Sequence, residues 1–192
     1  MTDAPLLRPD TPRLAPLPPS ELSPYARQVF DNVGPGGAAN LVATLAHQPE
    51  LFERFLPVTL VLQNGELSWR HREMAILRLA YQRRCRYIWQ QHVVIGLSAG
   101  ITEDEVPRLI DDPRDPAWSD DESALLQAVD ELVRDSCIGD STWAALAAGL
   151  TDAQLVELTV LVGHYSGLAF LANSAAVAPD ADPPSDPRLT PW

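Results

Sequence analysis

Residues 70–92 read RHREMAILRLAYQRRCRYIWQQH, and this stretch decides the fold. Met74, Leu77 and Tyr81 recur at the three- and four-residue intervals that place side chains along one side of an α-helix. A second helix is predicted to begin near Cys85, after only a short connection. The two helices are therefore expected to fold back on each other in antiparallel directions.

The same helical period continues on both sides of this stretch, and no segment shows the alternation of a half-buried β-strand. Proline, serine, threonine and aspartate stand where helices are expected to begin, and glycine or asparagine where several end. These signals predict further helices from Pro24 toward Asn32, from Pro49 to Asn64, after Thr102, from Ser119 to about Asp135, from Asp140 and from Thr151. We therefore predict an all-α fold.

Proline marks the ends of the folded region. Seven of the 18 prolines lie in residues 1–24 and five more in residues 179–191, and neither segment has periodic apolar residues. The chain is accordingly divided into an extended N-terminal arm (1–19), a helical domain (20–178) and a disordered C-terminal tail (179–192). A length of 192 residues suits one domain with a proper core.

The composition excludes several classes of protein. Acidic residues outnumber basic ones 26 to 14, and a net charge of -12 disfavours binding to nucleic acid. All 14 basic residues are arginine, so the sequence offers no lysine for Schiff-base chemistry. Two cysteines cannot make a disulfide scaffold, and the N-terminus lacks a signal-peptide pattern. We expect a cytoplasmic protein.

No pattern typical of a cofactor or metal site occurs. The four histidines lack metal-ligand spacing, and no glycine-rich phosphate loop is recognisable, so we expect neither metal nor cofactor. Residues 158–179 contain no charge and are long enough to span a bilayer. Polar residues within this segment and acidic flanks favour a buried central helix instead, and no membrane partner is expected.

Glu73, Cys85 and His92 form the candidate catalytic group. Cys85 and His92 are seven residues apart, so they lie on nearly the same side of one helix, while Glu73 belongs to the preceding helix. A carboxylate, a thiol and an imidazole can together build a proton relay. Three arginines beside Cys85 and its place at a helix start favour a thiolate. The alternative is that Cys85 is a small buried apolar residue.

These residues carry a resemblance to the carboxymuconolactone decarboxylase family, which includes the alkylhydroperoxidase D proteins. The similarity rests on the following segments: Leu17-Pro18, Glu21-Leu22, residues 47–51, Glu73, residues 85–92, residues 99–101, residues 156–158 and residues 162–165. The resemblance implies an alkylhydroperoxidase D-like helical domain. It also implies a homo-oligomer, as a dimer, trimer or hexamer, formed through apolar helices.

One departure from the family pattern matters for function. Redox members carry Cys-x-x-Cys, whereas Ile88 stands here at the second position and cannot form the disulfide. The leading prediction is therefore a non-redox decarboxylase, lyase or isomerase acting on a small keto or lactone acid. In it, His92 is the general acid and base, Glu73 orients His92, and Cys85 lines the pocket.

The predicted substrate-binding residues are Arg70, Tyr87, Ile88 and Trp89. Arg70 would hold a carboxylate, or would simply be a surface arginine. Two other functions stay open. The first is a thiol peroxidase that uses Cys85 alone and an external thiol as reductant. The second is a protein on the same scaffold that binds small molecules without catalysis.

Overall fold

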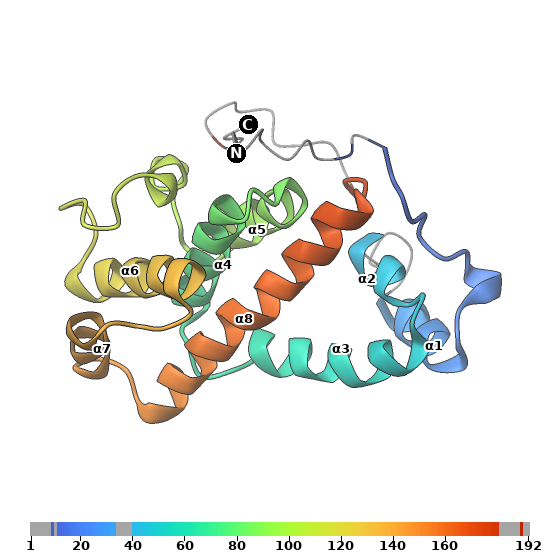
Figure 1. Ribbon diagram of the computed structural model, residues 1–192, viewed down its shortest axis with the longest axis horizontal. Helices are drawn as coiled ribbons and strands as arrows, with labels where there is room; N and C mark the ends of the chain where they lie inside the picture. Colours follow the sequence, from blue (N-terminus) through green and yellow to red (C-terminus); the bar gives the residue numbers. More distant parts are fainter. Residues whose placement is uncertain (1–8, 10, 34–39, 181–188, 190–192) are drawn as a thin grey trace, which may run out of the picture.

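The computed structural model describes residues 9, 11–33, 40–180 and 189. Within these residues the chain forms helices and no strand (Figure 1). The elements are the 3₁₀ helix η1 (Pro19–Glu21), α1 (Pro24–Val33), α2 (Asn40–Leu45), α3 (Pro49–Gln63), α4 (Trp69–Gln82), α5 (Arg86–Ser98), the 3₁₀ helix η2 (Pro107–Ile110), α6 (Asp120–Asp135), α7 (Asp140–Ala147) and α8 (Asp152–Ala175). The prediction of an all-α fold is confirmed.

Helix α4 lies at the centre of the main core. It packs against α5, α6 and α8, and every residue from Arg72 to Ala80 is buried. The apolar residues Met74, Leu77 and Leu79 have no exposed surface. Because neighbours cover α4 on all sides, its polar residues within this span must find their partners inside the protein.

Helix α8 crosses the molecule (Figure 1), and its buried and exposed residues lie on two different faces. One face, which includes Leu158, Leu161 and Tyr165, is buried in the main core. By length and composition alone α8 could span a membrane, and half of its apolar window is buried inside the protein. The expectation of a buried central helix thus holds for one face of α8.

A second, smaller core joins α1, α2 and α3 beside α8 (Figure 1). Phe52 of α3 is completely buried there, with Leu22, Ala26 and Ala46 around it. The Tyr25 ring meets the Phe52 ring edge-on, at 5.9 Å between centroids, which is a favourable aromatic geometry. This small core holds α3 in position against α8.

Most helix boundaries follow the predicted capping signals. Ser119 and Glu122 form a capping box at α6, and Thr151 forms one with Gln154 at α8. The Ser68 side chain accepts a hydrogen bond from the His71 amide at the start of α4. The glycine-rich break at 34–37 lies outside the described residues.

The short helix predicted after Thr102 is wrong. Residues 103–106 form turns, and only the 3₁₀ helix η2 follows at Pro107–Ile110. Pro107 has no amide hydrogen to donate to a carbonyl of the preceding turn, so a continuous α-helix through this position would lose a hydrogen bond. Glu105 also accepts hydrogen bonds from the Thr102 amide and hydroxyl, which closes a tight local turn instead.

The predicted arm and tail contact the helical body at several described residues. The Arg13 amide donates to the Ala175 carbonyl at the end of α8, over 2.8 Å. Asp180 binds α2 and α5, and Leu189 is buried in the main core. The rest of the predicted tail, 181–188 and 190–192, lies outside the described residues.

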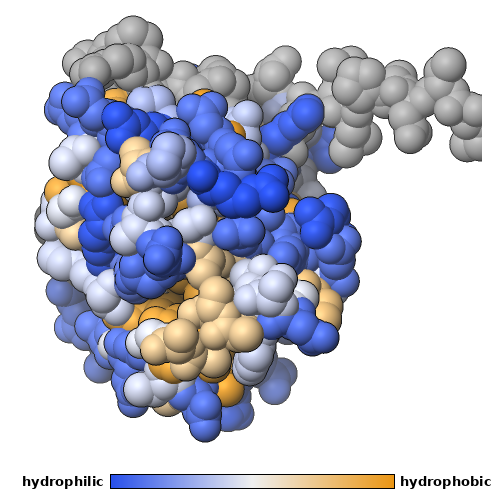
Figure 2. Space-filling model, turned by 90° about the vertical axis from the view of Figure 1, so that its left-hand side faces the viewer, coloured by the Kyte–Doolittle hydropathy of each residue, from blue (hydrophilic) through white to orange (hydrophobic). Residues whose placement is uncertain are grey.

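Apolar surface is exposed on α7. Figure 2 faces the end of the molecule that carries α6 and α7, and apolar side chains gather in its lower half. Trp143 is 45% exposed, and four alanines of the same region are also exposed: Ala144, Ala145, Ala147 and Ala148. A single patch of small side chains is common on soluble proteins and defines no site by itself.

A buried ion pair joins α4 to α6. The Arg78 guanidinium donates to both carboxylate oxygens of Asp130, at 2.7 and 2.6 Å. It also donates to the carbonyls of Leu109 and Asp111, at 2.7 and 2.6 Å. Arg78 is only 5% exposed, so its charge depends on these four acceptors.

We expect Arg78→Ala to destabilise the fold by about 3 kcal/mol, because it leaves Asp130 without its positively charged partner and two carbonyls without their donor. Urea unfolding followed by circular dichroism measures the change. The exposed pair Arg134–Asp135 provides the control, and Arg134→Ala should leave the unfolding free energy unchanged within error. Equal losses in the two variants would contradict the prediction.

Candidate active site

Glu73 and His92 form a buried hydrogen-bonded pair between α4 and α5. His92 Nδ1 lies 2.7 Å from Glu73 Oε2, and the two residues are 8% and 3% exposed. An ionised carboxylate can only accept, so Nδ1 carries the proton and donates. The antiparallel arrangement predicted from the short connection therefore brings these two candidate catalytic residues together.

Arg72 lies on the other side of the Glu73 carboxylate. Its Nε is 3.5 Å from Glu73 Oε1, and Arg72 is itself 8% exposed. The guanidinium is therefore the nearest positive charge to the carboxylate on that side. The negative charge of Glu73 is thus balanced inside the core while its second oxygen holds His92.

Tyr165 of α8 closes the site from a third helix. Its ring meets the His92 ring edge-on, with centroids 5.2 Å apart and planes at 84°. Burial raises the pKa of Tyr165 to about 12, and its hydroxyl is hydrogen-bonded to the Gln63 side chain. The phenol therefore stays protonated at neutral pH and can act as a hydrogen-bond donor.

This arrangement can transfer a proton through His92. Glu73 fixes the tautomer with the proton on Nδ1, so Nε2 is the atom that accepts or donates a proton in a reaction. No hydrogen bond to Nε2 is present among the described residues. An oriented imidazole backed by a carboxylate is a general acid and base.

Cys85 lies on the same helix but two turns away from His92. Cys85 is the N-cap residue of α5, so it lies just before the helical turn in which the sequence analysis expects it. It has no exposed surface. Seven residues of helix correspond to about 10 Å along the axis, too far for direct proton exchange. Ile88, four residues before His92 and 2% exposed, occupies the position next to the imidazole instead.

Tyr87 and Trp89 contact the C-terminal residues of the chain. The Tyr87 hydroxyl donates to Asp180 Oδ2, and the Trp89 indole donates to the Leu189 carbonyl over 2.7 Å. Both side chains are buried, at 7% and 1% exposed. Their role in substrate binding stays a prediction.

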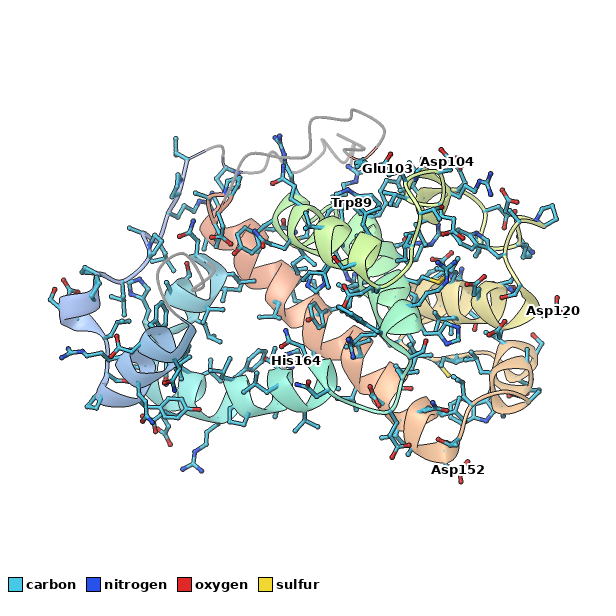
Figure 3. All side chains as sticks on the ribbon, turned by 180° about the vertical axis from the view of Figure 1, so that it is seen from behind. Trp89, Glu103, Asp104, Asp120, Asp152 and His164 are labelled. Carbon is cyan, nitrogen blue, oxygen red and sulfur yellow. The ribbon has the colours of Figure 1, made fainter. Side chains whose placement is uncertain are left out.

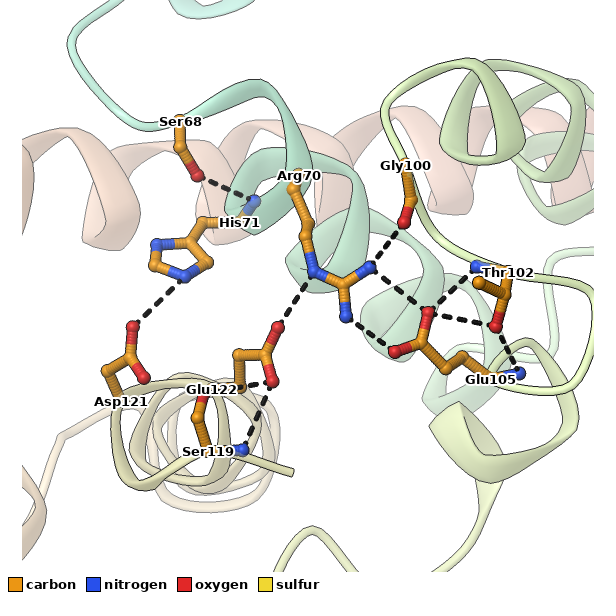
Figure 4. A network of polar contacts seen from close by, with 9 residues as sticks. All are labelled: Ser68, Arg70, His71, Gly100, Thr102, Glu105, Ser119, Asp121 and Glu122. Carbon is orange, nitrogen blue, oxygen red and sulfur yellow. Dashed lines mark hydrogen bonds and ion pairs between the residues drawn. The ribbon is translucent and has the colours of Figure 1, made fainter. Parts of the chain in front are cut away.

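Arg70 is engaged in a network at the surface (Figure 4). Its guanidinium binds Glu105 and Glu122 at 2.8 Å each, and it donates to the Gly100 carbonyl over 2.6 Å. These contacts tie α4 to α6 and to the loop after α5. An incoming carboxylate would have to displace the two glutamates, so an anion-holding role for Arg70 remains a prediction that these contacts do not favour.

His164 lies between α8 and α3 (Figure 3). Its Nε2 is 2.8 Å from the Thr59 hydroxyl, and its ring stacks on Phe55 with centroids 4.2 Å apart. Partial burial lowers the pKa of His164, which favours the neutral imidazole. The histidine thus fastens the outer helix α3 to α8.

Two cavities of the described part lie away from the Glu73–His92 pair. A shallow one of about 510 Å³ borders α1, and another of about 60 Å³ lies beside His71 and Asp121. The described residues also contain no cluster of three metal-ligating side chains. The pair itself is buried, with Tyr165 of α8 packed against the His92 ring.

Arg72 and Tyr165 are the site residues that sequence reasoning missed. Arg72 directly precedes Glu73, but neighbouring residues of a helix usually point their side chains in different directions, so their spacing predicts no contact between them. Tyr165 is 73 residues from His92, and only the packing of α8 brings them together. Its only signal was a polar ring within an apolar helix.

Comparisons with known proteins agree with this architecture. Residues 49–131 match the model of the carboxymuconolactone decarboxylase family. The structure described as the alkylhydroperoxidase AhpD core of a peroxidase-related protein from Ralstonia eutropha has a TM-score of 0.76 and 20% identity, over 90% of this chain and 94% of that chain. A peroxidase-related protein from a Silicibacter species gives 0.76 and 18%, over 92% and 96%.

A third similar structure is the debrominase Bmp8, with a TM-score of 0.72 and 14% identity over 88% of this chain and 92% of that chain. A variant of that debrominase with one cysteine replaced by alanine has been solved in complex with 2,3,4-tribromopyrrole. At these identities the likeness establishes the fold. A comparison of the sequence with curated proteins finds no match.

The helical arrangement is that of the alkylhydroperoxidase D-like proteins. The central segment, residues 49–131, matches the carboxymuconolactone decarboxylase family and contains the buried acid–imidazole pair. The predicted resemblance to this family and the predicted all-α, alkylhydroperoxidase D-like fold are confirmed.

The Arg70 network predicts a pH-dependent contribution to stability. The hydrogen bond from Arg70 lowers the pKa of Glu105 to about 2, below the value of about 4.3 expected in the unfolded chain. A depressed folded-state pKa stabilises the protein above pH 4.3, and this stabilisation disappears as the pH falls toward 2. Glu105→Gln should therefore unfold more easily than the unmodified chain at pH 6, with a difference that shrinks between pH 4.5 and pH 2.5.

Urea unfolding at each pH tests this expectation. Glu53→Gln changes an exposed acid in α3 and serves as the control, with no comparable pH-dependent difference. A constant difference for Glu105→Gln across the range would show that the ion pair does not account for its effect.

Proposed function

We propose that the protein is an acid–base enzyme of carboxymuconolactone decarboxylase type that acts on a small keto or lactone acid. His92 is the proton donor and acceptor, and Glu73 is the residue that orients it. The observation that carries the proposal is the buried hydrogen bond of 2.7 Å between His92 Nδ1 and Glu73 Oε2. The match of residues 49–131 to the family supports it.

The proposed chemistry needs only groups that the chain provides. In the decarboxylation of a β-keto acid, the bond between the α-carbon and the carboxylate breaks, and its electron pair stays on the substrate as an enolate. The His92 imidazolium then donates the Nε2 proton to the α-carbon, and it regains a proton from water. Glu73 stabilises the imidazolium throughout, and the Tyr165 hydroxyl is a candidate donor to the enolate oxygen.

The pairing of Glu73 with Arg72 also supports the proposal. Arg72 contacts one carboxylate oxygen of Glu73, which leaves the other oxygen to orient His92. The position next to His92 is taken by Ile88, which carries no proton and no charge. Acid–base chemistry at His92 therefore does not depend on the thiol of Cys85.

We expect carbon dioxide release from at least one acid in a panel of β-keto and lactone acids. For that acid, His92→Ala should lower kcat by about 10² to 10⁴, because the proton donor is lost. Glu73→Gln should lower kcat less, since an amide oxygen still accepts the Nδ1 hydrogen bond but carries no charge. Manometric or coupled detection of carbon dioxide measures both.

His47→Ala is the matched control, because this histidine is exposed and binds only the Ala15 carbonyl in the N-terminal arm. It should retain the activity of the unmodified chain. If one of the acids is a substrate and His92→Ala decarboxylates it with the same kcat as the unmodified chain, the assignment of His92 is contradicted.

Thiol chemistry at Cys85 is the second candidate function. It is favoured by the place of Cys85 at the start of α5 and by the fold shared with peroxidase-related proteins. A thiolate would attack an organic hydroperoxide to give a sulfenic acid and an alcohol, and an external thiol would reduce it. The complete burial of Cys85 and the absence of a second cysteine in its helix count against it. Hydroperoxide oxidation confined to Cys85, with exposed Cys137 unreacted, would favour this function over the first.

We further propose that the protein is a homo-oligomer that pairs through the outer face of α8. Val156, Val160, Gly163, Gly167 and Phe170 are all exposed and follow each other at intervals of four, three, four and three residues. This is the spacing of a seam between two helices, and the two glycines have open space in front of them. No charge interrupts the seam, which suits contact between two chains that each carry a net charge of -12.

We expect multi-angle light scattering to give a mass of at least two 21.0 kDa chains. Val160→Glu places a charge at the middle of the seam and should shift the mass toward one chain. Val94→Glu, at an exposed valine of α5 outside the seam, should leave the mass unchanged. A mass of one chain for the unmodified protein would rule out the seam as an interface.

A further inference from the structure

We infer that Tyr87, Gln91 and the backbone amide of Asn40 form a carboxylate-binding site that the chain's own Asp180 occupies and that a small organic acid can take over. The inference is independent of the proposed activity. Tyr87 and Gln91 lie on a different side of α5 from His92, which faces α4.

Both oxygens of the Asp180 carboxylate are held by hydrogen bonds. Oδ1 accepts from the Asn40 amide over 2.6 Å. Oδ2 accepts from the Tyr87 hydroxyl and from Gln91 Nε2, the latter over 2.9 Å. Three donors from two helices that are distant in sequence thus converge on one carboxylate.

Tyr87 is built to donate. It is 7% exposed, and its oxygen already accepts a hydrogen bond from the Leu41 amide over 3.3 Å. Burial, together with the hydrogen bond to Asp180, raises the pKa of Tyr87, so the phenol keeps its proton. The phenol oxygen already accepts a hydrogen bond from an amide, so the hydroxyl proton is left to donate. The acceptor that it reaches is the Asp180 carboxylate.

The site binds a carboxylate without a cation. Among the described residues, the donors to Asp180 are a phenol, a side-chain amide and a backbone amide, and none of these groups is charged. Asp180 itself is exposed, and two carbonyls of the same segment, Ala178 and Pro179, accept from the Asn40 side chain. The occupant is therefore held by hydrogen bonds to neutral groups at the surface, which an external carboxylate can replace one for one.

The ligand class follows from the donor geometry. Three converging donors match a single carboxylate with two oxygens. Apart from the Tyr87 hydroxyl, the side chains of Tyr87 and Leu41 beside these donors belong to the hydrophobic core. A short aliphatic monocarboxylic acid is the simplest molecule with both features. The site also adjoins the start of α5, where Cys85 lies close enough to Tyr87 to contribute to the raised pKa of the phenol.

Competition between Asp180 and an added acid tests the inference on the full-length chain. Sodium propionate is titrated against ¹⁵N-labelled protein, and the shifts of the Asn40 backbone amide and the Gln91 side-chain amide are followed by NMR. Sodium chloride at the same ionic strength is the reference. We expect Asp180→Ala to saturate at a propionate concentration at least about tenfold lower than the unmodified chain, because the tethered competitor is gone.

Three further variants make the result specific. Asp180→Ala combined with Tyr87→Phe should weaken propionate binding by about tenfold or more, since a hydrogen bond to a charged group is lost. Asp31→Ala removes an exposed acid in α1 and should behave like the unmodified chain. Asp180→Asn keeps the size of the side chain and replaces the alanine variant if that variant disturbs the fold. It should give the same gain in affinity for propionate.

The inference is overturned if neither Asp180 variant responds to propionate beyond the response to chloride. Asp180 would then be a permanent tether between the C-terminal segment and α5. Equal affinity in Asp180→Ala and in its Tyr87→Phe derivative would likewise exclude the site.

Discussion

The fold depends on a helix that carries charged residues through the middle of an apolar core. Helix α4 is buried from residue 72 to residue 80, yet this span includes Arg72, Glu73 and Arg78. A buried charge without a partner would be strongly destabilising, so each of these groups determines what packs beside it. Arg78 fixes α6 through Asp130, and Glu73 fixes α5 through His92. The contacts that hold the helices in place and the contacts that form the site are therefore the same set.

Local sequence signals account for most of the fold. Capping residues such as Ser119 and Thr151 mark helix starts because their side chains satisfy amides within four residues, and this information is entirely local. The turn at residues 103–106 was predicted wrongly because Thr102 caps with Glu105 in both a helix and a turn, and Pro107 decides between them. The Glu73–His92 pair could be predicted because a short connection leaves two helices only one way to pack.

The remainder of the site could not be read from the sequence, for a physical reason. Tyr165 reaches His92, and Asp180 reaches Tyr87, only because α8 and the segment after it return across α5. Such contacts depend on the angle and position of whole helices, which no spacing within one helix encodes. Arg70 illustrates the reverse case: its side chain suits an anion site, but the loop after α5 and the start of α6 supply two glutamates that occupy it.

The replacement of a second cysteine by Ile88 separates two features that the family pattern combines. A residue four positions before His92 lies next to the imidazole, whereas Cys85 lies a further turn away at the helix start. With Ile88 in the nearer position, the Glu73–His92 pair keeps its hydrogen bond and its burial but has no thiol within reach. The groups that do adjoin it are Arg72 and Tyr165. The buried pair is thus separated by about two helical turns from the residue that redox chemistry would need.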